Sequence, residues 1–184
     1  MKRFLLDTSA LLTLRDDEPG ADRVAQVLEM AMQGQAKCYG CFMTLMEIFY
    51  RVWRDENEAA GQLAYQQCLA LPIEWLHNTE TLLVKAAQFK ALYPLSIADA
   101  WIAACASEHS AVLLHKDPEF KVLAVSQELL PLTTKKIKER GDRSVPHPLP
   151  RHHQAHARQN QHAADQVMQL QWLTQQQPSY NCRV

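Results

Sequence analysis

The sequence lacks a long apolar run, an excess of charge of one sign and a regular set of cysteines. No apolar stretch approaches the roughly 20 residues needed to cross a bilayer. The apolar residues that follow Met1-Lys2-Arg3 are too few for a secretory signal peptide. We therefore expect a cytoplasmic protein with no membrane partner. Its 184 residues are enough for one well-buried domain.

The formal net charge is −1, so the chain is not a strongly basic domain that would bind nucleic acid through its charge. A cation bound by some of its 20 acidic residues would offset their charge locally. The overall charge therefore neither supports nor excludes RNA as a partner.

Five cysteines make an odd number, and only Cys38 and Cys41 have the spacing of a metal or redox pair. A zinc site would need two further ligands at suitable spacing. Because both cysteines lie in a predicted strand, we interpret them as ordinary core or edge thiols.

Short apolar runs alternate with segments of helical periodicity, which predicts an α/β fold with a parallel sheet flanked by helices. The predicted strands are residues 3–6, 37–42, 73–76, 111–114 and 128–132. The predicted helices are one around residues 24–31 and four at 44–54, 58–71, 79–93 and 96–109.

Residues from about 137 onward differ in composition, with many histidines, prolines and glutamines. Such a segment buries little apolar surface, so we expect it to be disordered or partly helical, with a short helix at 163–173. A metal-binding role for the histidines is an alternative. We predict a folded domain at residues 1–136 and a separate tail at 137–184, and expect the domain to fold without the tail.

Four acidic residues each lie at or near the end of an apolar segment: Asp7, Glu47, Asp99 and Asp117. Carboxylates beside buried segments are costly unless something compensates them. If the four converge, a hard divalent cation such as Mg²⁺ or Mn²⁺ is the natural compensator, because it prefers oxygen ligands. A metal-dependent hydrolase is therefore the leading interpretation.

Two of these acids also have a purely structural interpretation. Thr44-x-x-Glu47 and Ser96-x-x-Asp99 both have the spacing of capping boxes, with the acid in the first turn of a helix. Capping contributes about 1 kcal/mol and implies no catalysis. The two interpretations are compatible, because a helix N-terminus favours an anion.

Several segments resemble the PIN-domain ribonucleases, and most closely the VapC-like toxins of prokaryotic toxin–antitoxin pairs. The matching stretches, in family order over roughly residues 1–133, are Leu6-Asp7-Thr8-Ser9-Ala10-Leu11-Leu12, Glu18-Pro19-Gly20-Ala21, Thr44-Leu45-Met46-Glu47, Leu95-Ser96-Ile97-Ala98-Asp99-Ala100 and Asp117-Pro118-Glu119-Phe120. The chain departs from the family at His115, where Thr or Ser is usual.

The resemblance implies a three-layer α/β/α domain with a central parallel sheet of about five strands. It implies a Mg²⁺- or Mn²⁺-dependent endoribonuclease in which Asp7, Glu47, Asp99 and Asp117 are the catalytic metal ligands. The expected partners are an RNA substrate, a cognate antitoxin and a second copy of the chain. A non-catalytic module that binds RNA or protein is the alternative. Phosphoryl transfer through Asp7 is less favoured, because that class typically has an acid at the position of Ser9.

Overall fold

The predicted strands form one parallel sheet with the order β3-β2-β1-β4-β5. The computed structural model describes residues 1–132. The strands are β1 (Lys2–Leu6), β2 (Ala36–Cys41), β3 (Glu74–Leu76), β4 (Val112–His115) and β5 (Gln127–Leu129). The first and fourth strands are neighbours, with Leu6 opposite Leu114. The chain order therefore reverses beside β1, which is where doubly wound sheets bind their ligands.

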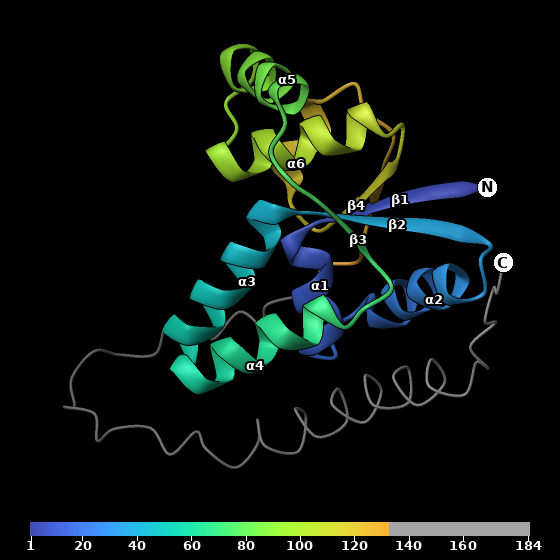
Figure 1. Ribbon diagram of the computed structural model, residues 1–184, viewed down its shortest axis with the longest axis vertical. Coiled ribbons are helices and arrows are strands. Elements are labelled where there is room, and N and C mark those ends of the chain that lie inside the picture. Colours follow the sequence, from blue (N-terminus) through green and yellow to red (C-terminus); the bar gives the residue numbers. More distant parts are fainter. Residues whose placement is uncertain (133–184) are drawn as a thin grey trace, which may run out of the picture.

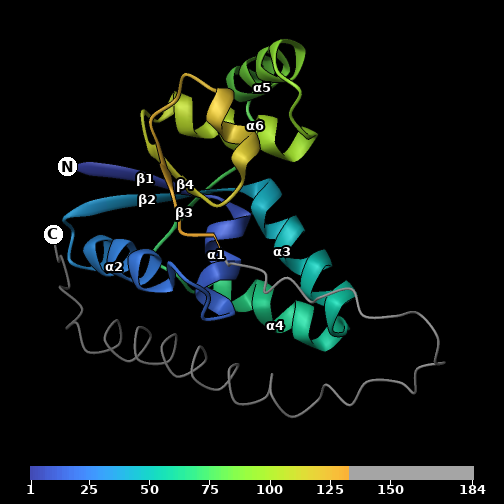
Figure 2. The same ribbon diagram turned by 180° about the vertical axis from the view of Figure 1, so that it is seen from behind.

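Helices cover both faces of the sheet and complete three layers (Figures 1 and 2). They are α1 (Thr8–Arg15), α2 (Ala21–Met32), α3 (Phe42–Asp55), α4 (Glu58–Leu69), α5 (Glu80–Leu92) and α6 (Ile97–Glu108). Phe4 and Leu6 of β1 pack with residues of α1 to α4, whereas Leu5 between them packs with α5 and α6. This alternation gives the central strand two buried faces, which explains its continuous apolar sequence. No helix within residues 1–132 is long and apolar enough to span a bilayer.

The α/β prediction is confirmed, and the first four strands lie within one residue of their predicted ends. The fifth strand differs, because it spans Gln127–Leu129 rather than 128–132. Pro131 has no N–H to donate, so the ladder cannot extend through it. The helix α1 and the 3₁₀ turn η1 (Pro118–Val122) were not predicted. The predicted tail at 137–184, with its short helix at 163–173, lies outside the described residues.

Gly61 allows α4 to pack closely against α3. A Cβ atom at this position would lie 2.8 Å from the carbonyl oxygen of Phe49 and 3.0 Å from the Cβ of Trp53. Alanine is the better helix former by about 1 kcal/mol, but the clash with a backbone atom requires the helices to separate. We expect Gly61→Ala to destabilise the protein by about 1–2 kcal/mol in urea unfolding. Gln62→Ala, an exposed change on the same helix, is the control and should be neutral or slightly stabilising.

Candidate active site

The carboxyl ends of β1 and β4 bring Asp7 and Asp117 to the same edge of the sheet. Asp7 directly follows β1, and Asp117 follows the neighbouring β4 by two residues. Glu47 lies in the second turn of α3, which directly continues β2 on the other side of β1. Asp99 lies in the first turn of α6. The topology therefore directs all four predicted acids toward the carboxyl end of the sheet.

Asp7 is the most buried of the four, with only 4% of its surface exposed. Its Oδ2 accepts hydrogen bonds from the backbone N–H of Ser9, at 3.0 Å, and from the Ser9 hydroxyl. The Ser9 oxygen in turn accepts the Lys116 backbone N–H at 2.9 Å, so β4 and α1 hold Asp7 between them. Burial raises the pKa of Asp7 to about 6. The Ser9 hydrogen bonds oppose this rise, and the charges of Asp99 and Glu47 add to it.

Glu47 is held by a residue from a distant part of the sequence. Its Oε2 accepts a hydrogen bond from the Thr8 hydroxyl at 2.6 Å. Partial burial raises the pKa of Glu47, the Thr8 hydrogen bond lowers it, and the charges of Asp99 and Asp117 raise it again. Arg51, one turn later on α3, lowers it. Glu47 is thus within electrostatic range of Asp99 and Asp117. Asp7 is within electrostatic range of Glu47 and Asp99.

The predicted N-terminal cap is found for one of the two capping boxes, and the other prediction is wrong. Ser96 caps α6, since its Oγ accepts the backbone N–H of Asp99 at 3.0 Å. Thr44 is not a cap, because α3 begins at Phe42 directly after β2 and Cys41 occupies the N-cap position. The Thr44 hydroxyl is fully buried, without a hydrogen-bond partner among the described residues. Glu47 therefore does not serve as a capping acid, and the structural interpretation of this residue fails.

His115 lies in the core at the end of β4 and is fully buried. Its Nε2 is 3.1 Å from Oε1 of Gln127, and its ring contacts Phe120 edge-on. Burial lowers its pKa, so the imidazole is neutral at physiological pH. Asp117, two residues later, accepts the Glu119 backbone N–H at 2.8 Å and caps η1.

The four acids offer only carboxylate oxygens, which are the ligands that a hard cation prefers. A bound cation would also relieve the repulsion between the four carboxylates. Within residues 1–132, however, no three His, Cys, Asp or Glu side chains are grouped closely enough to hold one ion. Simultaneous binding by three of these acids therefore requires their side chains to turn inward from the positions seen here.

Thr8, Ser9 and Lys116 are site residues whose contacts were not predicted. Thr8 and Ser9 follow Asp7 directly, so their proximity to the site was visible in the sequence, but their partners were not. Lys116 forms an ion pair with Glu18 at 2.7 Å, and its side chain is 10% exposed. The segment around Glu18 is thus tied to the edge of the site.

The structure separates the two cysteines that have pair spacing. Both cysteines belong to β2. Cys38 lies in the core between the sheet and helices α1 to α4, whereas Cys41 lies in the core between the sheet and helices α5 and α6. They point to opposite faces, because residues three apart in a strand do not share a face. The thiol that interacts with Cys41 is Cys105 of α6. The interpretation of Cys38 and Cys41 as core thiols agrees with their burial.

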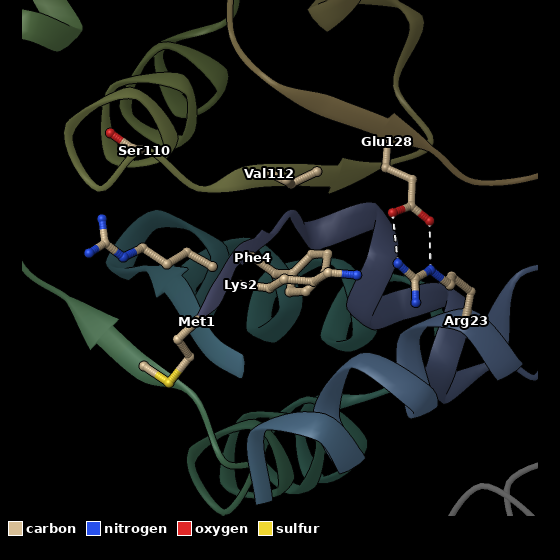
Figure 3. A pocket seen from close by; sticks show the side chains of 8 residues that line it. Met1, Lys2, Phe4, Arg23, Ser110, Val112 and Glu128 are labelled. Atoms are coloured by element: carbon tan, nitrogen blue, oxygen red, sulfur yellow. Dashed lines mark hydrogen bonds and ion pairs between the residues drawn. The ribbon is translucent and has the colours of Figure 1, made fainter. Parts of the chain in front are cut away.

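A cavity of about 440 Å³ lies away from these acids, near the amino end of β1 (Figure 3). Its lining includes Lys2, Phe4 and Val112. Arg23 and Glu128 close one side through two hydrogen bonds of 2.6 and 2.9 Å, which fasten α2 to the edge strand β5 (Figure 3). None of the four acids lines this cavity.

The PIN domain family model matches residues 4–126, which is more than half of the chain. The chain belongs to the PIN-domain family. This confirms the resemblance that the acidic segments indicated. No curated protein sequence matches the chain.

Solved structures with the same fold include VapBC2 from Rickettsia felis bound to a promoter DNA fragment (17% identity, TM-score 0.59, covering 70% of this chain and 99% of that one). VapBC from Salmonella typhimurium, also bound to DNA, is 18% identical (TM-score 0.55, 70% and 98% covered). VapC20 from Mycobacterium tuberculosis, described as a sarcin-ricin loop cleaving toxin, is 16% identical (TM-score 0.56, 70% and 99% covered). These similarities establish that this PIN domain has the fold of VapC-type proteins.

Proposed function

We propose that this PIN-domain protein is a Mg²⁺- or Mn²⁺-dependent endoribonuclease that acts as the toxin of a toxin–antitoxin pair. The observation that supports the proposal is electrostatic: the charges of Asp99 and Glu47 act on Asp7, and those of Asp99 and Asp117 act on Glu47. A buried carboxylate with a raised pKa among other acids is typical of a functional site.

The side chains around the acids have separable roles in this proposal. Asp7, Glu47, Asp99 and Asp117 would hold the cation, which would supply Lewis-acid activation of water and of the phosphodiester. Ser9 fixes the carboxylate of Asp7, and Thr8 orients Glu47 toward the same site. Asp99 is additionally placed by the Ser96 cap at the positive end of α6. Hydrogen bonds thereby fix the carboxylates of Asp7 and Glu47 before ligand arrives.

The toxin assignment and the partners rest on family and fold. VapBC pairs are toxin–antitoxin complexes, and two of the similar structures contain such pairs. We therefore propose a cognate antitoxin and a homodimer in the cytoplasm, with RNA as substrate. The phosphoryl-transfer alternative is weaker, because Ser9 stands where that class has its second acid and donates its hydroxyl to Asp7.

Incubating the purified protein with cellular RNA and mapping the new ends by sequencing tests the proposal. We expect cleavage with Mg²⁺ or Mn²⁺, complete loss of cleavage in EDTA, and recovery when either ion is added in excess. Cleavage that persists in EDTA would contradict metal dependence. Binding of RNA without new ends under any of these conditions would instead favour the non-catalytic module.

A further inference from the structure

A partly buried hydrogen-bonded network connects His115 to the turn that carries Asp117. Gln127 of β5 is at its centre. The amide nitrogen of Gln127 donates to the carbonyl oxygens of Phe120, at 3.1 Å, and Leu123, at 3.2 Å. Both carbonyls belong to η1 or its C-terminal cap. The side chain of Gln127 therefore fastens the C-terminal half of this turn to the edge of the sheet.

The orientation of the Gln127 amide determines the role of the imidazole. Because its nitrogen faces two carbonyl oxygens, its Oε1 faces His115 and can only accept a hydrogen bond. His115 Nε2 must then carry the hydrogen that it donates over 3.1 Å. In the neutral ring this leaves Nδ1 without a hydrogen, and Nδ1 is buried without a hydrogen-bond partner of normal geometry among the described residues.

The other contacts of His115 lead to the same turn. Its ring meets that of Phe120 at 5.1 Å and 74°, and Phe120 is fully buried in the middle of η1. Its carbonyl oxygen accepts the Leu130 N–H at 2.7 Å, which continues the β4–β5 pairing. Asp117 begins the turn and is oriented by the N–H of Glu119. The conformation of η1 thus decides where the Asp117 carboxylate points.

We propose that His115 is a positioning residue that sets the Asp117 carboxylate by holding η1 through Gln127 and Phe120. It does not act as a proton donor or acceptor for substrate, because Nε2 is engaged and the ring has no exposed surface. This role rests on the proposed function, in which Asp117 helps to bind the cation. The ring also interacts directly with the backbone of Asp117, the first residue of the turn.

His115→Leu and His115→Gln form a matched pair that tests this role. Leucine fills much of the ring volume but removes both nitrogens, whereas the glutamine amide can still donate to Gln127. We expect His115→Leu to raise the Mn²⁺ concentration for half-maximal cleavage and half-maximal thermal stabilisation by about tenfold, as for other residues that orient a ligand. Cleavage at saturating Mn²⁺ should change much less, and His115→Gln should recover most of the Mn²⁺ affinity.

Hydrogen exchange of the backbone amides of residues 119–123, measured without metal or RNA, gives a readout independent of activity. We expect exchange to be roughly tenfold faster in His115→Leu and in Gln127→Leu, because local opening of the turn becomes easier. The double variant should be no worse than the single variants, because both break the same network. His77→Leu, at an exposed histidine outside this network, is the control. It should change neither the Mn²⁺ affinity nor the exchange rate of residues 119–123.

The outcomes separate this inference from the proposed function. A parent protein that neither cleaves RNA nor binds Mn²⁺ would contradict the proposed function, and amide exchange would still decide whether His115 holds the turn. Unchanged exchange in His115→Leu would overturn the positioning role, as would a His115→Gln variant no better than His115→Leu. Additive effects of the His115 and Gln127 substitutions on amide exchange would also overturn the positioning role.

Discussion

Replacing Asp7 with Asn should abolish metal-dependent cleavage and at the same time stabilise the metal-free protein. The loss of cleavage should be roughly 100-fold or more, since Lewis-acid stabilisation is worth several kcal/mol. The gain in stability follows because burial and neighbouring acids raise the pKa of Asp7 from 3.8 to about 6. Its ionised form is therefore unfavourable in the empty site. Asn removes this charge and can still accept the Ser9 N–H.

The size and pH dependence of this gain follow from proton linkage. A native-state pKa above the unfolded-state value means that the native state binds the proton more tightly. The free energy of unfolding therefore rises as the pH falls through about 6. The stabilisation that comes from protonating Asp7 is fully present below about pH 3.8. At pH 7.5 the ionised group costs up to about 3 kcal/mol. We expect Asp7→Asn to exceed the parent by about 1–3 kcal/mol at pH 7.5, and the difference to disappear near pH 4.

Urea unfolding of the parent and variant at pH 7.5 and pH 4, in EDTA, measures this difference. Melts with and without Mn²⁺ should show that the parent gains stability from the ion and the variant does not, because a ligand stabilises in proportion to its affinity for the native state. Asp17→Asn is the control at an exposed acid outside the site, and should leave cleavage unchanged. Asp7 is also the N-cap residue of α1. A destabilised Asp7→Asn protein that still cleaves RNA would show that capping is its only role.

Replacing Phe120 with Ala should cost about 3–5 kcal/mol, the largest stability effect expected here. Phe120 is fully buried in the α5–α6 side of the core, and it supports the ring of His115. The cavity left behind cannot close easily, because the same residue's carbonyl is held by Gln127. Such a loss is a large fraction of the stability of an ordinary domain.

Val122→Ala is the matched control, because Val122 belongs to the same short turn but is 58% exposed. It should change stability by less than about 0.5 kcal/mol. Thermal or urea unfolding compares the two, and Phe120→Leu should recover much of the loss by refilling the site. Equal effects of the Phe120 and Val122 changes would mean that η1 does not anchor the edge of the domain.

The sequence alone determined the order of the elements and the positions of the acids along them. Strands buried on both faces need continuous apolar residues, so β1, β2 and β4 were predicted to within a residue. Asp7 and Asp117 could be assigned to one edge of the sheet only through the family resemblance, which implies that the first and fourth strands are neighbours, as the structure has them. The PIN family was also recognisable, since its motifs are local and their order is preserved.

Only the tertiary structure decided which distant side chains meet. Thr8 holds Glu47 across 39 residues, because α1 and α3 follow the neighbouring strands β1 and β2. The start of α3 was predicted wrongly, since β2 runs into it without a loop and leaves no local signal for its first turn. His115 was equally ambiguous in the sequence. Its burial and its hydrogen bond to Gln127 exist only because β5 pairs with β4, a contact that no local pattern specifies.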